Sequence, residues 1–115
     1  MSDPYTRREI KECFISEVAP DEEVCIVGRV VNVSEEQIFL DDGRDQIAVL
    51  VDYSKVKDEL KVGDIVRVIG RVRTYTPTKT LYIDSEIVRK INGLDVELYE
   101  EVIKLKRAIL RIIEL

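Results

Sequence analysis

The chain of 115 residues contains no histidine, and it has only two cysteines, Cys13 and Cys25. Without histidine it lacks the commonest general base and any Ser-His or Cys-His nucleophile pair, so an enzyme is the least expected class. The cysteines do not form a CxxC motif, which favours two small core residues over a metal site. No apolar run approaches the roughly 18 to 20 residues that cross a bilayer, and the N-terminus has no apolar signal core. A cytoplasmic location is therefore expected.

The charge of the chain is acidic but unevenly distributed. Its formal net charge is −5 and its pI is about 4.9, which argues against non-specific binding of nucleic acid by the whole surface. The first 23 residues carry seven acidic and three basic residues, whereas residues 65–82 contain no acidic residue at all. The basic residues of that window are Arg67, Arg71, Arg73 and Lys79. Any nucleic-acid contact is expected there. The abundance of Lys, Glu, Ile and Val also leans toward a thermophilic source.

Short β-type runs separated by turns fill residues 23–91. Strands are predicted at residues 24–33, 37–40, 46–52, 65–75 and from 81 to about 90. Asp41-Asp42-Gly43 is predicted to be a hairpin turn and not a metal site. The phrase Ile26-Val-Gly-Arg-Val30 returns as Val68-Ile-Gly-Arg-Val72. A glycine inside a strand indicates a bulge or bend, so the first and fourth strands are expected to bend at their glycines.

Residues 53–60 interrupt the alternation and predict a short helix. Ser54 is its expected cap, and Val56 and Leu60 would bury one side. Three strands, a short helix and two more strands are typical of an OB-fold, a five-stranded Greek-key barrel. An SH3-like barrel is the alternative, but it offers no place for a helix between the third and fourth strands. We therefore expect a mainly β protein with an N-terminal arm at 1–22, partly packed on the barrel, and an OB-fold barrel at 23–91.

Residues 92–115 are predicted to form a long C-terminal helix that begins at Asp95. Acidic residues fill its first half and basic residues its second, which complements the helix dipole. Two apolar rows run along it, more than one barrel would cover, so we expect an oligomerisation helix. The alternative is a helix folded fully onto its own barrel. The expected partner-binding residues are Leu98, Tyr99, Val102, Ile103, Leu105, Ile109, Leu110, Ile112 and Ile113.

OB-folds usually bind single-stranded nucleic acid or oligosaccharide, although the fold alone does not choose a function. A single strand needs cations for its phosphates and flat side chains on which bases stack. Tyr75 is the best-placed aromatic, whereas for Phe39 a core position is at least as plausible. The candidate nucleic-acid-binding residues are Tyr75, Arg71, Arg73, Lys79, Arg67, Tyr82 and Phe39. No metal or cofactor is expected.

Several phrases in order carry a family resemblance. They are Ile15-Ser-Glu-Val18, Val24–Val30, Leu40–Gly43 and Val66–Tyr75, followed by the C-terminal helix. Together, over residues 13–113, they resemble the single-OB-fold middle or small subunits of replication protein A, of archaeal type. The resemblance implies single-stranded DNA binding, in DNA replication and repair, within a heterotrimer held by a bundle of C-terminal helices. It also implies a stacking role for Tyr75, in the context Arg73-Thr74-Tyr75, whereas Leu50 stands where the family has its other stacking aromatic.

We therefore expect a non-enzymatic subunit that assembles with other OB-fold subunits through its C-terminal helix and adds weak contacts to single-stranded DNA. A telomere-capping type OB-fold subunit, with the same barrel and helix, is one alternative. A protein-interaction barrel without nucleic acid is another: the acidic pI favours it and the acid-free window at 65–82 opposes it. A homodimer of the isolated chain through its helix also stays open.

Overall fold

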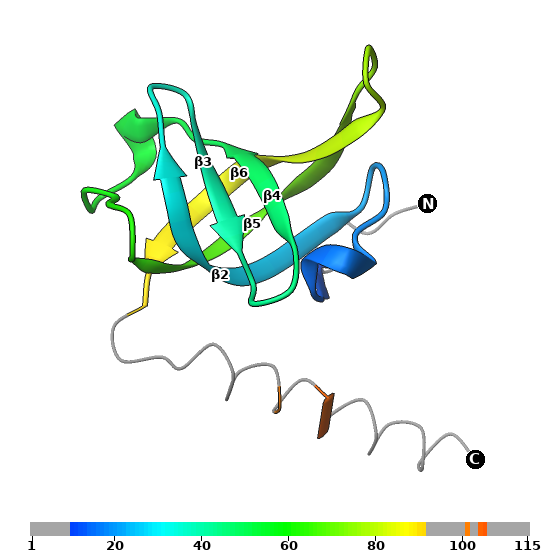
Figure 1. The fold of residues 1–115 in the computed structure, drawn as a ribbon. Helices are drawn as coiled ribbons and strands as arrows, with labels where there is room; N and C mark the ends of the chain where they lie inside the picture. The colour runs from blue at the N-terminus through cyan, green and yellow to red at the C-terminus, as the bar shows by residue number, and fades with distance from the viewer. Residues whose placement is uncertain (1–9, 92–100, 102–103, 106–115) are drawn as a thin grey trace, which may run out of the picture.

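The computed structural model describes residues 10–91, 101 and 104–105. Strands β2 to β6 form a closed barrel, which confirms the predicted OB-fold (Figure 1). The predicted strand bounds agree with the structure to within two residues. The elements are β1 (Lys11–Glu12), the 3-10 helix η1 (Ile15–Glu17), β2 (Glu23–Val33), β3 (Gln37–Asp41), β4 (Gln46–Leu50), the 3-10 helix η2 (Tyr53–Lys55), β5 (Ile65–Tyr75) and β6 (Thr80–Lys90).

The sheet has the order β1-β2-β3-β4-β6-β5 and closes because β5 also pairs with β2. The β1–β2 and β4–β6 pairs are parallel, and the other pairs are antiparallel. The β4–β6 contact is short, joining residues 48–50 to residues 82–84. The β5–β6 hairpin runs on past this contact and projects from the barrel (Figure 1).

Alternating apolar side chains of the strands fill the barrel. Val66, Val68 and Val72 are fully buried, as their shared face in the sequence predicted. Val24 and Ile26 of β2 meet them in the core. Burying a side chain of this size contributes about 1.5–3 kcal/mol, so these positions supply much of the stability. Both cysteines are free and buried, and Cys13 belongs to the core cluster.

The two glycines predicted to bend their strands act differently. At Gly70 the β5–β6 register shifts, which confirms the bulge. A Cβ at Gly70 would collide with the Asp84 carbonyl oxygen and lie 2.8 Å from the Ser85 Cα. In β2 the register irregularity lies between Val30 and Asn32, so no bulge lies at Gly28, and the bend predicted there stays a prediction. Gly28 is needed instead for close packing, since a Cβ there would lie 3.0 Å from the Asp41 carbonyl oxygen.

The helix predicted at residues 53–60 is only the single 3-10 turn η2, and its cap differs from the prediction. The Asp52 side chain caps it by accepting hydrogen bonds from the Ser54 amide (3.1 Å) and hydroxyl (2.6 Å). Ser54 is therefore the donor, not the cap. These hydrogen bonds also hold the pKa of the Asp52 carboxyl below its usual range. Leu60 is buried and Val56 half-buried, so both still pack on the barrel, from an irregular segment.

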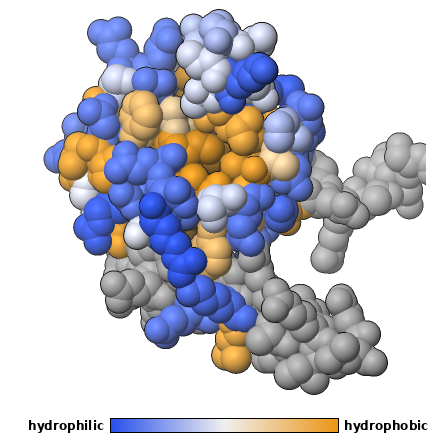
Figure 2. Space-filling model, turned by 45° about the vertical axis from the view of Figure 1, so that its right-hand side comes forward, coloured by the Kyte–Doolittle hydropathy of each residue, from blue (hydrophilic) through white to orange (hydrophobic). Residues whose placement is uncertain are grey.

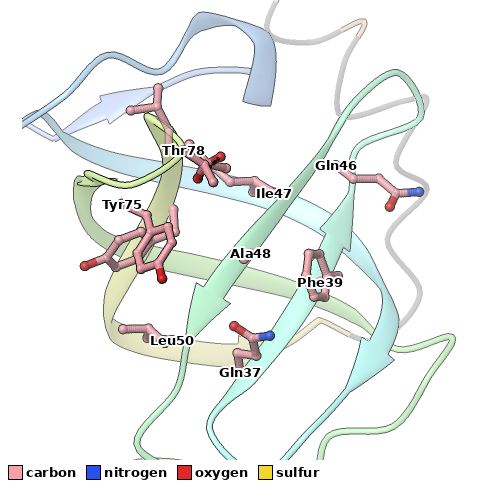
Figure 3. Close-up of a pocket in the computed structure, with 11 residues that line it drawn as sticks. Gln37, Phe39, Gln46, Ile47, Ala48, Leu50, Tyr75 and Thr78 are labelled. Carbon is pink, nitrogen blue, oxygen red and sulfur yellow. Dashed lines mark hydrogen bonds between the residues drawn. The ribbon is translucent and has the colours of Figure 1, made fainter.

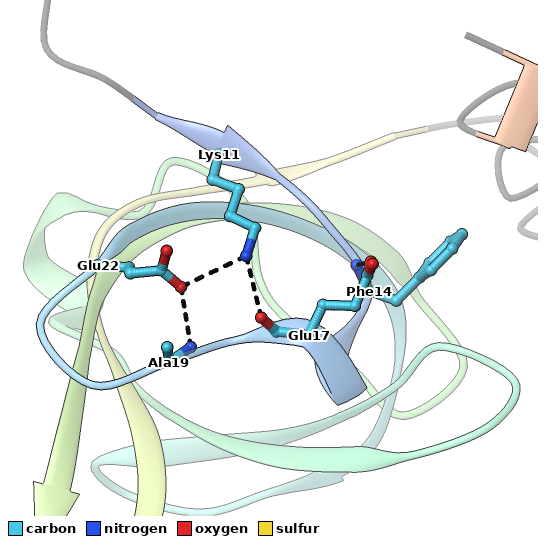
Figure 4. Close-up of polar contacts among 5 residues, drawn as sticks. All are labelled: Lys11, Phe14, Glu17, Ala19 and Glu22. Carbon is cyan, nitrogen blue, oxygen red and sulfur yellow. Dashed lines mark hydrogen bonds and ion pairs between the residues drawn. The ribbon is translucent and has the colours of Figure 1, made fainter. Parts of the chain in front are cut away.

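Residues 10–22 lie against β2 through β1, a two-residue strand that was not predicted. A group of polar contacts holds this segment in place (Figure 4). The Lys11 ammonium donates to the Glu17 carbonyl oxygen (3.1 Å) and forms an ion pair with Glu22 (3.5 Å). The Glu22 carboxylate also accepts from the Ala19 amide (2.9 Å).

Asp42 joins the N-terminal segment to the β3–β4 turn. Its carboxylate is 2% exposed and accepts from the Ile15 amide (2.9 Å) and from the Arg44 and Asp45 amides (3.0 Å each). The prediction that Asp41-Asp42-Gly43 forms a hairpin turn is confirmed, and Gly43 has φ of 97°. The sequence did not indicate that this turn would also anchor residue 15.

Most of the predicted C-terminal helix lies outside the described residues. Glu101, Lys104 and Leu105 are described, and their backbone is helical. The boundaries predicted at residues 22 and 91 stay predictions. In the part of the chain that the structure describes, no helix is long and apolar enough to cross a membrane.

The bulge gives a direct test of the fold. Replacing Gly70 by Ala should lower the free energy of unfolding by about 1–3 kcal/mol, because the Asp84 backbone must move to make room. Gly28→Ala is the control and should cost less, since its Cβ meets only a 3.0 Å contact. Chemical denaturation of both variants measures the difference. Equal losses would show that the bulge does not depend on Gly70.

Candidate nucleic-acid interface

A pocket lies on the outer face of β3 and β4, beside the turn end of the β5–β6 hairpin (Figure 3). Its volume is about 560 Å³, within the usual range for ligand sites. On this side of the molecule an apolar patch is ringed by hydrophilic side chains (Figure 2). We call this site the groove. It is lined by Gln37, Phe39, Gln46, Ile47, Ala48, Leu50, Tyr75, Thr78, Thr80, Leu81 and Tyr82.

The strand register places two aromatic rings in one row across the groove. Phe39 of β3 lies opposite Ala48 of β4, and Ala48 lies opposite Tyr82 of β6. Directly paired residues project from the same face of a sheet, so the small Ala48 separates the two rings and leaves space above itself. Phe39 and Tyr82 are half-buried, which corrects the view of Phe39 as equally a core residue. We call Phe39, Ala48 and Tyr82 the aromatic row.

Tyr75 forms the rim of the groove at the end of β5. It is 56% exposed and pairs with Thr80 across the hairpin. At the tip, the Thr78 and Thr80 hydroxyls share a hydrogen bond of 2.7 Å, and Lys79 between them takes a left-handed conformation with φ of 57°. All three predicted aromatics, Phe39, Tyr75 and Tyr82, therefore meet in one site.

The four predicted cations do not all meet there. Arg73 pairs with Tyr82, so it extends the aromatic row, and Lys79 lies exposed at the hairpin tip. Arg71 forms an ion pair with Glu23 (2.9 Å) and donates to the Asp21 carbonyl oxygen (2.7 Å). Arg67 lies further down β5, where it pairs with residues that do not line the groove. The structure thus leaves two of the four predicted cations beside the groove.

Sequence reasoning missed the polar and small lining residues. Gln37 and Gln46 lie on either side of the aromatic row, and Gln46 donates to the Asp41 carboxylate (3.1 Å). Their signal was present: Gln37 and Phe39, like Gln46, Ala48 and Leu50, occupy alternate positions of predicted strands. Leu50, singled out in the sequence as a replaced aromatic, is 37% exposed and lines the groove.

The chemistry of the groove suits flat, neutral rings. None of its lining residues carries a charge; they present rings, aliphatic surface, amides and hydroxyls. Aromatic side chains stack on bases of any sequence, while amides and hydroxyls pair with base edges. Among residues 10–91, 101 and 104–105 there is no cluster of three or more side chains that could hold a metal ion.

Residues 4–112 match the family described as telomere-capping, CST complex subunit. This match spans nearly the whole chain. A comparison with curated protein sequences gave no match.

Solved structures share the fold at low sequence identity. The telomere capping protein Ten1 from Saccharomyces pombe is 16% identical, with a TM-score of 0.73 over 87% of this chain and 99% of that one. The S. pombe Stn1-Ten1 complex gives 16% identity and a TM-score of 0.74 over 91% and 98%. U. maydis replication protein A bound to single-stranded DNA gives 18% and 0.59 over 81% and 82%.

The two arginines of the hairpin allow a matched comparison. Arg71→Ala should lower the free energy of unfolding by about 1 kcal/mol, because it removes a partly exposed ion pair and a hydrogen bond. Arg73 has no ion pair among the described residues, so Arg73→Ala should change stability by less than roughly 0.5 kcal/mol. Thermal or urea unfolding of the two variants measures this. A larger loss of stability for Arg73→Ala than for Arg71→Ala would contradict the view that Arg71 is the arginine held by an ion pair.

Proposed function

The chain belongs to the family of telomere-capping CST complex subunits, and we propose that it is a non-enzymatic OB-fold subunit of a complex that binds single-stranded DNA. The groove supplies contacts to the bases. The C-terminal helix, predicted at residues 95–113, joins the chain to its partner subunits.

One observation carries the DNA-binding part of the proposal. The aromatic row, with Tyr75 on the rim and Arg73 at its end, places stacking surfaces beside a cation. Bases bind between the rings, above Ala48, and the adjacent phosphates reach Arg73 and Lys79. An oligosaccharide is less suited, because it has no phosphates for Arg73 and Lys79 to bind.

The contribution of this subunit to affinity is modest. Each stacked base contributes about 1–3 kcal/mol. Two cations beside the groove neutralise two phosphates, which gives a single-strand salt slope of about −1.4. The net charge of −5 opposes any wider contact with the DNA backbone. Tight binding therefore requires the other subunits of the complex.

Titration of fluorescent oligo-dT with the isolated chain at several salt concentrations tests the groove. Tyr75→Ala should weaken binding by about 1–3 kcal/mol, because it removes one stacking ring. Val62→Ala, at a 66% exposed position outside the groove, is the control and should leave binding unchanged. Nanomolar, salt-insensitive binding would contradict the modest contribution proposed here. An unchanged affinity of Tyr75→Ala would exclude stacking by Tyr75.

Support for assembly through the helix comes from Leu105. This leucine lies on the heptad row of the predicted helix, is helical, and is 62% exposed in the isolated chain. A leucine so exposed on an apolar row is a candidate for contact with another subunit.

Leu105→Asp should abolish association with the partner subunits and leave the barrel folded, because the side chain is not part of the core. Tagged chain is purified from its native host with nuclease, and co-purifying OB-fold subunits are identified by mass spectrometry. Lys104→Ala, at the adjacent exposed position, is the control. Loss of barrel structure in Leu105→Asp would favour a helix folded fully onto its own barrel.

A replication protein A type of assembly is the second candidate. It is favoured by the structural likeness to replication protein A bound to single-stranded DNA. The same purification separates the two: a Stn1-like partner supports the telomere-capping type, and two further replication protein A subunits support the heterotrimer and its role in replication and repair. A partner that stays bound while DNA never binds would favour a protein-interaction barrel.

A further inference from the structure

A second face of the barrel, away from the groove, is apolar and basic. Alternation along β2, β5 and β6 places nine neighbouring side chains on the side of the sheet opposite the core, and the register arranges them in three rows. Cys25 and Val27 of β2 are buried there (5% and 3% exposed), so the accessible part of this side is formed mainly by β5 and β6. We call these nine side chains the arginine face. Its rows are Cys25, Ile69 and Ile87; Val27, Arg67 and Arg89; and Arg29, Ile65 and Ile91. No acidic residue is among these nine, and the nearest carboxylate in the register is that of Glu12 in β1, which pairs with Cys25 at the edge of the first row.

Two arginines on this face oppose each other without compensation. Arg67 of β5 and Arg89 of β6 are direct cross-strand partners, and both are exposed. Neither side chain has an ion pair or hydrogen bond within the described residues. Like charges directly opposite each other destabilise a sheet. A bound group that carries carboxylates would turn this repulsion into attraction.

The apolar part of the face identifies the kind of group that fits. Ile87 is 41% exposed, and Ile65, Ile69 and Ile91 are partly exposed. Cys25 is only 5% exposed, and burial raises the pKa of its thiol while nearby Arg67 acts in the opposite direction. A surface of exposed isoleucines between arginines fits an amphipathic, acidic segment better than a DNA backbone, which offers phosphates but no apolar side chain.

The chain itself continues into such a segment. Ile91 closes the third row by donating its amide to the Ile65 carbonyl oxygen (2.8 Å), and Asn92-Gly93 follow at once. Residues 94–102 contain apolar Leu94, Leu98 and Val102 at spacings of four. Their acidic residues are Asp95, Glu97, Glu100 and Glu101, and no basic residue occurs before Lys104.

We propose that residues 94–102, the first half of the predicted C-terminal helix, dock on the arginine face. The chain reverses at Asn92-Gly93, the apolar side of the segment covers the isoleucines, and Asp95 and Glu97 beside that side face Arg67 and Arg89. The tether of only a few residues gives the segment a high effective concentration at this face.

The lengths agree. From Ile91 to Ile87 the strand runs about 13 Å, at about 3.3 Å per residue. A helix covers that distance in about nine residues at 1.5 Å each, which is the length of residues 94–102. Leu105 lies beyond this length, and it is 62% exposed. The docked half would thus fix the direction of the helix and leave its second half for a partner subunit.

Disulfide trapping in the full chain tests the docking. In an antiparallel arrangement Val102 reaches the row of Ile87, so Ile87→Cys with Val102→Cys should form an intramolecular disulfide under oxidised glutathione. Ile87→Cys with Ile109→Cys is the matched control, since Ile109 lies on the same heptad row about 10 Å further along the helix. The first pair should react roughly tenfold faster, because docking raises the local thiol concentration. The unmodified chain, whose cysteines are buried, measures the background.

Reversing charges tests the arginines. Arg67→Glu with Arg89→Glu should slow trapping at Val102, and Asp95→Arg with Glu97→Arg added to that chain should restore it. Equal rates for Val102 and Ile109, a cross-linked dimer in place of a monomer, or failure of the charge swap to restore trapping would overturn the proposal. If Ile87→Cys disturbs the fold by circular dichroism, Ile69→Cys in the same row replaces it, combined with Cys25→Ser because Cys25 is the direct partner of Ile69. Because neither DNA nor a partner is present, failure here is independent of the proposed function.

Discussion

Closure of the barrel through β5 is the constraint on which the rest of the structure depends. β5 pairs with β2 on one side and with β6 on the other, and both ladders must fit one strand. They fit because Gly70 has no side chain where the Asp84 carbonyl oxygen approaches. The bulge there also decides which residues of β6 face the core. Ile69 pairs with Ile87 but Gly70 with Ser85, so the register changes by one residue. Without that change Arg73 would lie opposite Ile83, and Tyr82 would point into the barrel.

The groove follows from this change of register. With it, Ile83 is fully buried and Tyr82 joins Phe39 across Ala48. The short parallel contact between β4 and β6 brings the row together, although its two rings come from distant parts of the chain. The groove presents rings and no charged side chain, which would suit the proposed role as one subunit of a larger DNA-binding complex. The chain shares its fold with Ten1 and with replication protein A.

The cations of the 65–82 window serve different purposes. Arg71 holds Glu23 and Asp21 beside the barrel, and Arg73 borders the groove. Arg67 belongs to the arginine face, where the chain leaves β6. Groove and arginine face share the long strands β5 and β6 but use different parts of them. Docking of the chain's own residues 94–102 on the arginine face, as proposed, would therefore leave the groove open to a nucleic-acid strand.

The sequence by itself determined the barrel, its strand bounds, the bulge at Gly70 and the three aromatics. Alternation of apolar and polar side chains, and a glycine inside a strand, are local signals that can be identified without knowing which strands pair. The sequence also indicated a family of OB-fold subunits, and the telomere-capping type was among its alternatives. Only the tertiary structure decided the rest. Three features depend on contacts between distant parts of the chain. They are the ion pair of Arg71, the hydrogen bond from the Ile15 amide to Asp42, and the position of Ala48 between Phe39 and Tyr82. Strand pairing also brings Arg67 against Arg89, which no local pattern could reveal.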